Sequence, residues 1–146
     1  DEVGMWGGDD PDERKPVVWG DLRYEDETAH PFGRAMPRAA VAPDTALFRV
    51  YRELIALRKA HLRLFVDGSA GWLLGEDAKG VVADERVLGE ERAVVALNAS
   101  DMPQEVSLKA EGRYRLAWPA GEAATAEGGQ IRVTLPARSG RVFLRE

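Results

Sequence analysis

The sequence predicts a mainly β protein, in which an antiparallel β-sandwich follows a long irregular segment and one helix. Three observations support this fold class. From about residue 65 to the end, apolar and polar residues alternate with the period of two that is typical of half-buried strands. Turn residues separate these short runs, and no helical pattern lies between them. Hydrophobic residues make up 45% of the 146 residues, which is enough for a packed core.

The chain begins with two segments that show no regular period. Asp1–Trp19 contains the breakers Gly7-Gly8 and Asp10-Pro11, and we predict that it is a loop. Gly20–Pro43 is interrupted by prolines and glycines, and we predict an irregular connection with one short helical turn near Tyr24–Thr28. Structureless segments longer than about 15 residues are uncommon in compact domains and are usually functional or mobile.

The segment Asp44–His61 is predicted to be a helix. Asp44 or Thr45 is a suitable N-cap after Pro43, and the basic residues near His61 suit the negative end of the helix dipole. The apolar face is broad; it contains Leu47, Phe48, Val50, Tyr51, Leu54, Ile55 and Leu57. Such a face has to be covered by something large. Because an exposed apolar patch invites association, we expect the chain either to self-associate through Asp44–His61 or to leave Asp1–Pro43 mobile.

Seven strands are predicted after this helix. They are Gly71–Leu74, Gly80–Leu88, Arg92–Asn98, Gln104–Leu108, Gly112–Trp118, Gln130–Leu135 and Gly140–Leu144. The tripeptide at 89–91 joins two of them as a tight hairpin, and the stretches 98–103 and 119–129 supply turns. Short strands at regular spacing without intervening helices indicate an antiparallel sandwich.

The composition excludes several kinds of function. The net charge of −5 and the pI of about 5.2 argue against nucleic acid or an anionic membrane as a partner. There is no cysteine, and the only histidines, His30 and His61, lie on different elements, so neither a zinc site nor a cofactor is predicted. The acidic run formed by Asp9, Asp10, Asp12 and Glu13 lacks the spacing of an EF-hand, which favours a solvated acidic turn over a calcium site.

Carbohydrate binding is the chemistry that the remaining pattern suggests. Asp10 and Arg14 are four residues apart across a turn, so they can hydrogen-bond sugar hydroxyls as a fork, or pair only with each other. Trp6, in a loop, is a candidate for stacking on a sugar ring. Trp72 and Trp118 lie in predicted strands, and we predict that both belong to the core.

Three blocks of the sequence resemble the alpha-amylase family of glycoside hydrolases. The first block contains Asp1-Glu2-Val3-Gly4-Met5, Gly7-Gly8, Asp10-Pro11, Arg14, Pro16 and Trp19. It resembles the segment after the eighth barrel strand, above all in the neopullulanase, cyclomaltodextrinase and maltogenic amylase group. The helical block Tyr51–His61 resembles the last barrel helix, and Arg92–Ser100 and Leu135–Leu144 resemble strands of the C-terminal β-sandwich.

This resemblance implies the end of a (β/α)8 barrel over residues 1–62 and a C-terminal β-sandwich over residues 63–146. It places Asp10 and Arg14 on a bound glucosyl unit, with Trp6 as a weaker candidate. It also implies that the nucleophile, the acid/base and a third carboxylate lie upstream of Asp1, so the chain holds no catalytic residue and is expected to be inactive alone.

The implied partners are an upstream catalytic barrel of the same protein and an α-glucan oligosaccharide. Two departures from the family pattern concern the segment Gly20–Pro43, which is longer than usual, and His61-Leu62, where the family has His-Pro. The long segment is therefore expected either to shape the substrate cleft or to be disordered.

Two alternatives stay open. The chain is either an autonomous carbohydrate-binding module, which an exposed aromatic platform on the sheet would favour, or a purely structural piece that packs against its barrel. Tryptophans buried against the helix would argue against the binding module.

Overall fold

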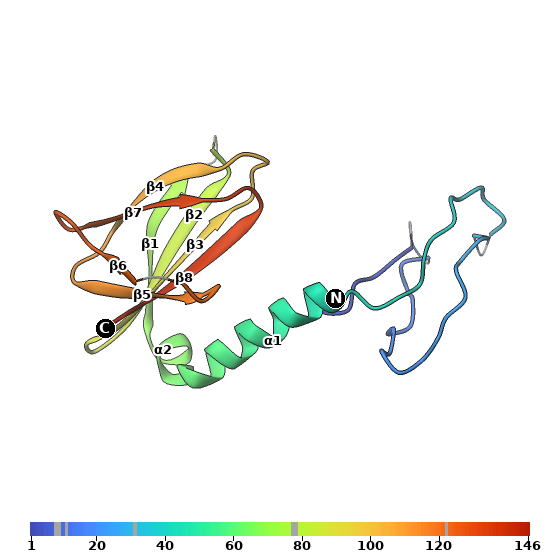
Figure 1. Ribbon diagram of the computed structural model, residues 1–146, viewed down its shortest axis with the longest axis horizontal. Helices are drawn as coiled ribbons and strands as arrows, with labels where there is room; N and C mark the ends of the chain where they lie inside the picture. The colour runs from blue at the N-terminus through green and yellow to red at the C-terminus, as the bar shows by residue number, and fades with distance from the viewer. Residues whose placement is uncertain (8–9, 11, 31, 77–78, 122) are drawn as a thin grey trace. The chain divides into compact units, whose positions relative to one another are not determined.

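The computed structural model describes residues 1–7, 10, 12–30, 32–76, 79–121 and 123–146. The chain divides into two compact units, Asp1–Leu54 and Ile55–Glu146 (Figure 1). The first contains the irregular N-terminal segments and most of helix α1 (Thr45–Ala60). The second contains the rest of α1, helix α2 (Leu62–Val66) and all the strands.

Helix α1 begins where the sequence predicts. The backbone N–H of Leu47 donates to Oδ1 of Asp44 at 2.9 Å, which is the N-cap bond expected of this residue type. None of the described residues of α1 is buried, and Phe48, Tyr51 and Ile55 on its apolar face are 41%, 38% and 51% exposed. These three residues of the apolar face are therefore exposed, whereas Leu57 near the end of α1 packs against the sheet.

Helix α2 is an element that the sequence analysis missed. The chain turns at His61, whose carbonyl accepts from the N–H of Phe65 at 3.1 Å, and Asp67 N–H donates to the Arg63 carbonyl at 2.8 Å. Five residues are too few to show a helical period. Leu64 of α2 is 1% exposed, and it packs on the sheet together with the end of α1.

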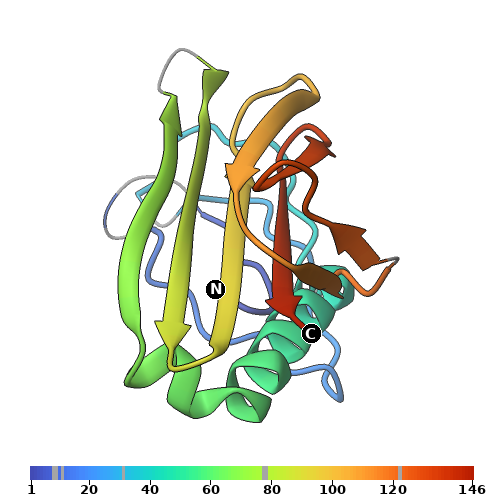
Figure 2. The same ribbon diagram turned by 90° about the vertical axis from the view of Figure 1, so that its left-hand side faces the viewer.

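The strands form a sandwich of two antiparallel sheets (Figure 2). They are β1 (Ser69–Glu76), β2 (Val81–Leu88), β3 (Glu91–Asn98), β4 (Gln104–Lys109), β5 (Arg113–Trp118), β6 (Ala123–Thr125), β7 (Gln130–Leu135) and β8 (Ser139–Arg145). The larger sheet has the order β1-β2-β3-β8-β5-β6, and β4 pairs with β7 in the smaller one. All seven predicted strands are present, and the antiparallel sandwich is confirmed.

Strand β6 was predicted to be part of a turn. It pairs with β5 over only three residues, from Arg113 opposite Thr125 to Arg115 opposite Ala123, so it is too short to show alternation. The predicted hairpin between β2 and β3 is present, with Leu88 opposite Glu91 and a two-residue loop. Gly89 has a φ of +59° in this loop, as the first loop position of a type II′ turn requires.

The larger sheet is covered on both faces. Its inner face packs against the smaller sheet around a core that includes Val94, Leu108, Tyr114, Ile131, Leu135 and Phe143. Its outer face packs on α2 and the end of α1 through Leu57, Leu64, Phe65, Leu88, Ala93, Ala117 and Leu144. Alternation along β8 explains the division, because Phe143 belongs to the inner cluster and its neighbour Leu144 to the outer one.

The prediction that Trp72 belongs to the core is wrong, since its side chain is 80% exposed. The register of β1 shifts between Trp72 and Leu74, so Leu73 and Leu74 both pack against the inner core. A bulge of this kind adds a residue and changes the alternation, and β1 is an edge strand, where one side lacks neighbours. Trp118 is partly buried.

We expect that Tyr114→Phe stabilises the sandwich by about 1 kcal/mol, because a buried hydroxyl without a partner costs about that much. Tyr114 is fully buried, and its hydroxyl forms no hydrogen bond with any residue in the described part of the chain. Urea unfolding followed by far-UV circular dichroism measures the change. Tyr114→Leu serves as the control that also removes the ring, and it should destabilise. A decrease of more than about 1 kcal/mol in the free energy of unfolding of Tyr114→Phe would show that the hydroxyl has a stabilising role.

Candidate functional site

The predicted sugar-binding loop lies in the unit Asp1–Leu54. Its beginning is fixed to the start of α1, because Asp44 N–H donates to the Val3 carbonyl at 2.7 Å. A turn closes over the first residues through Gly4 N–H and the Asp1 carbonyl at 3.0 Å. The N-cap residue of α1 therefore also holds the start of the loop.

Lys15 is the centre of the polar contacts in this loop. Its Nζ donates to Oδ1 of Asp12 and to Oε1 of Glu27, both at 2.5 Å. The other carboxylate oxygen of Glu27 accepts from the indole Nε1 of Trp6 at 2.5 Å. Asp12 is 2% exposed, so the network brings a buried carboxylate, a cation and an aromatic ring together.

The sequence does not identify Lys15, Asp12 and Glu27 as a group. The i, i+3 spacing of Asp12 and Lys15 was a signal for one of the two contacts. Nothing local indicates the contact with Glu27, which lies 12 residues further along the chain. Glu27 is placed by an antiparallel bridge to Ala39, and the helical turn predicted near Tyr24–Thr28 is wrong, because residues 24–28 contain no helix.

A raised Lys15 pKa leads to a prediction for alkaline pH. The hydrogen bonds to Asp12 and then to Glu27 raise the pKa of Lys15 above its ordinary value of 10.5. A cation with a raised folded-state pKa contributes stability that is present below the unfolded-state pKa and lost as the pH rises through the folded-state pKa. We therefore expect the loop to loosen above pH 10.5, while it stays ordered at neutral pH.

Fluorine NMR of the chain labelled with 5-fluorotryptophan measures this change, because Trp6 contacts the same network. The Trp6 resonance should shift in the alkaline range in the wild type. In Lys15→Arg the shift should be absent or move to higher pH, since guanidinium stays protonated there. An identical alkaline transition in both proteins would assign it to other groups.

Asp10 and Arg14 are brought together as the sequence predicts. Oδ1 of Asp10 lies 2.5 Å from Nη2 of Arg14, and the two side chains are 64% and 72% exposed. The carboxylate and the guanidinium pair with each other and stay open to solvent. Gly8, Asp9 and Pro11, which belong to the same motif, lie outside the described residues.

Trp6 is positioned differently from a free stacking platform. Its side chain is partly buried, and its indole N–H is occupied by Glu27. Gly7 follows it with a φ of +120°, and a Cβ at this position would lie 2.5 Å from the carbonyl oxygen of Asp12. Close packing of the loop backbone therefore requires glycine here.

A cavity of about 370 Å³ lies between the loop and the segment that follows it. It is lined by Gly7 and Asp12 on one side and by His30 and residues 34–39 on the other. Among the described residues, no group of three or more His, Asp or Glu side chains is arranged to hold a metal ion. No helix in the described part of the chain is long and apolar enough to cross a membrane.

Comparison with known proteins places these features in a family context. No family model matches the chain. In sequence, the chain is 28% identical over 138 residues to a cyclomaltodextrinase of Geobacillus thermopakistaniensis (strain MAS1), covering 93% of this chain and 20% of that protein. It is 27% identical over 146 residues to neopullulanase 2 of Thermoactinomyces vulgaris, covering 98% of this chain and 22% of that protein.

Comparison of the fold with solved structures points to the same group of enzymes as the sequence comparison. A solved cyclomaltodextrinase superimposes with a TM-score of 0.73 at 20% identity, covering all of this chain and 22% of that chain. The chain spans about a fifth of the length of the curated relatives it matches. The chain is therefore similar in sequence to part of two alpha-glucan hydrolases, and its fold matches the C-terminal β-sandwich of solved alpha-amylase-family structures.

Proposed function

We propose that the chain is the C-terminal portion of a retaining glycosidase that acts on α-glucans or maltodextrins. Residues 1–62 would complete the catalytic barrel, and residues 63–146 would form the stabilising sandwich. The observation that carries the proposal is the exposed Asp10–Arg14 ion pair, which lies on the loop that resembles the family's segment after the eighth barrel strand. The names of the relatives, cyclomaltodextrinase and neopullulanase, support the substrate class.

In this proposal Asp10 and Arg14 hold one glucosyl unit. A guanidinium has five N–H donors, so a single contact with Asp10 leaves donors for sugar hydroxyls. The Asp10 carboxylate accepts from hydroxyl groups at the same time. Because each group holds the other in place, little side-chain freedom is lost when the sugar binds. Trp6 supports this pair indirectly, because its indole N–H donates to Glu27 in the network that orders the loop.

The chemistry itself belongs to the part of the enzyme upstream of Asp1. Retaining hydrolysis needs a nucleophile and an acid/base on opposite sides of the scissile bond. Two neighbouring carboxylates on one loop do not meet this requirement. The 146-residue chain should therefore bind a maltodextrin weakly and release no reducing sugar from maltotriose or pullulan.

The experiment combines a reducing-sugar assay with NMR titration of maltotriose into the pure chain. Arg14→Gln and Asp10→Asn should weaken the chemical-shift response. The matched control is Arg63→Gln, because Arg63 and Asp67 form another exposed i, i+4 ion pair at 3.7 Å. Turnover by the pure chain would contradict the absence of catalytic residues, and an unchanged response in both variants would contradict the sugar-binding role.

The partner for the apolar face of α1 is part of the same proposal. Phe48, Tyr51 and Ile55 form an i, i+3, i+7 stripe that stays exposed in the chain. This stripe suits packing against barrel strands, and without them a second copy of the chain is the available partner. Sedimentation equilibrium tests this, and Ile55→Asp should shift an oligomer to monomer. A wild-type chain that is monomeric at high concentration would contradict self-association.

The exposure of Trp72 favours a second candidate function, an autonomous carbohydrate-binding module on the sandwich. Trp72 lies on the edge strand β1 directly opposite Asp84, whose carboxylate pairs with Arg86 at 3.2 Å. A flat exposed ring beside polar groups suits stacking on a sugar face. Amylose binding that is lost in Trp72→Ala and kept in Trp19→Ala, another exposed tryptophan, would support this candidate. Equal binding by both variants would exclude it.

A further inference from the structure

The long segment after Trp19 contains a closed arm, residues 27–39, which we call the insert arm. Glu27 and Ala39 exchange two backbone hydrogen bonds of 2.9 Å at its neck. Next to the neck, Arg38 Nε donates to Oδ2 of Asp26 at 2.5 Å. Because Glu27 also binds Trp6 and Lys15, the neck is fixed to the loop that carries Asp10 and Arg14.

The insert arm and the loop line the open cavity of about 370 Å³. The loop contributes the buried residue Asp12, which lies between Asp10 and Arg14 in the sequence. The arm contributes His30 and Arg34. The cavity therefore shares Asp12 with the loop that carries Asp10 and Arg14, and it is lined by groups that the family resemblance does not assign.

Two donors and an aromatic ring are available on the arm. The exposed side chain of Arg34 forms no ion pair or hydrogen bond with any residue that the structure describes. Nδ1 of His30 accepts from Phe32 N–H at 3.0 Å, which leaves Nε2 as the donor of a neutral imidazole. The ring of Phe32 is 65% exposed and lies 5.8 Å from that of His30.

This set of groups favours a neutral polyhydroxylated ligand over an anion. An anion would be attracted by Arg34, but the carboxylate of Asp12 lines the same cavity, and Arg38 is already paired with Asp26. A sugar ring has hydroxyls for the guanidinium and the imidazole of the cavity lining. It also has an apolar face for Phe32, whose ring lies outside this lining and 5.8 Å from that of His30. The cavity is large enough for one ring of this kind, since binding pockets for small molecules begin at about 300 Å³.

We propose that the insert arm forms a second sugar subsite beside Asp10 and Arg14, in which Arg34 and His30 donate hydrogen bonds to a further glucosyl unit and Phe32 covers its apolar face. The inference rests on the proposed function, because the second unit belongs to the same α-glucan chain. It makes Arg34 a residue that determines preference for longer oligosaccharides.

The test compares the affinities of the 146-residue chain for maltose and maltotetraose by NMR titration. The wild type should bind maltotetraose more tightly than maltose. Arg34→Ala should weaken maltotetraose binding about tenfold, the loss expected for one hydrogen bond from a charged donor, and leave maltose binding unchanged. Arg23→Ala is the matched control, since Arg23 is an exposed cation of the same segment outside the cavity.

The outcomes separate this inference from the proposed function. If Arg14→Gln weakens binding of both sugars while Arg34→Ala changes neither, the insert-arm subsite is wrong and the Asp10–Arg14 subsite stands. If Arg34→Ala removes the chain-length preference while Arg14→Gln has no effect, the arm binds sugar and the Asp10–Arg14 assignment is wrong. If the wild type binds neither sugar, the proposed function and the inference both fail.

Discussion

Replacing Asn98 with Asp is expected to destabilise the sandwich by about 4 kcal/mol, which is a large part of the stability of an ordinary domain. Asn98 ends β3 and is 2% exposed. Its side-chain amide lies against three backbone carbonyls, those of Met102 at 2.8 Å, Leu135 at 3.1 Å and Pro136 at 2.8 Å. The side chain thereby joins the turn after β3 to the end of β7.

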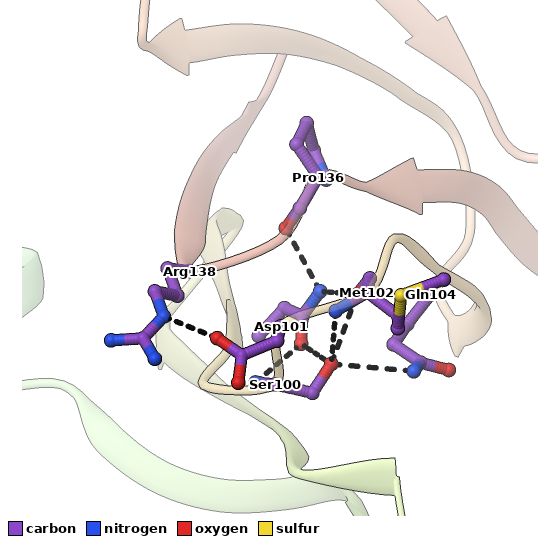
Figure 3. A network of polar contacts seen from close by, with 7 residues as sticks. Ser100, Asp101, Met102, Gln104, Pro136 and Arg138 are labelled. Carbon is purple, nitrogen blue, oxygen red and sulfur yellow. Dashed lines mark hydrogen bonds and ion pairs between the residues drawn. The ribbon is translucent and has the colours of Figure 1, made fainter.

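Ser100, Met102 and Pro136 take part in one network of polar contacts (Figure 3). Asn98 Oδ1 accepts from the backbone N–H of Ser100 at 2.9 Å and from its hydroxyl at 2.7 Å. An aspartate keeps these two bonds but turns a second oxygen toward the three carbonyls. The carbonyls lose their donor and face a like-charged atom in a poorly solvated place.

Thermal unfolding followed by circular dichroism should show a decrease in Tm of roughly 20 °C for Asn98→Asp. Lowering the pH toward the carboxyl pKa should recover part of the loss, because the protonated acid has a donor again. Asn98→Ala, which removes both the N–H donor and the oxygen acceptor of the side chain, should be destabilised at every pH. The control is Gln104→Ala, which loses only a 3.3 Å contact with Ser100 Oγ. Equal stability of Asn98→Asp and Gln104→Ala would show that the carbonyls do not depend on Asn98.

The sandwich was predictable from the sequence because strands such as β4 alternate clearly. Along β4, Val106 and Leu108 are buried while Glu105, Ser107 and Lys109 are exposed, and this pattern needs no knowledge of the partner strand. Trp72 shows the limit of the rule. The bulge in β1 depends on pairing with β2, so its effect on which face Trp72 occupies was not visible in the local sequence.

The candidate site was predictable only in part. The i, i+4 spacing across a turn was sufficient to bring Asp10 and Arg14 together. Lys15, Glu27 and the insert arm depend on contacts between residues 12 to 21 positions apart. Loops have no hydrophobic period that reports such contacts, so their polar partners become visible only in the structure.

Replacing Lys15 with Met is expected to release the loop and the insert arm together. The change removes the cation that Asp12 and Glu27 share, and two carboxylates that were held around one ammonium then repel each other. The side chains of Lys15 and Asp12 are 11% and 1% exposed. We therefore expect a larger effect on the order of the loop than the loss of an exposed ion pair would have.

Amide hydrogen exchange at neutral pH measures this release. In Lys15→Met the amides of Glu27 and Ala39, which form the neck of the insert arm, should lose protection, and the fluorine resonance of Trp6 should move toward its unfolded position. Protection along β3 and β8 should stay unchanged, since these strands belong to the other unit. Lys15→Arg keeps the charge and should preserve most of the order, and Arg23→Met removes an exposed cation and should have little effect. If Glu27 and Ala39 stay protected in Lys15→Met, the backbone bridge alone holds the arm, and the subsite proposed above does not depend on the Lys15 network.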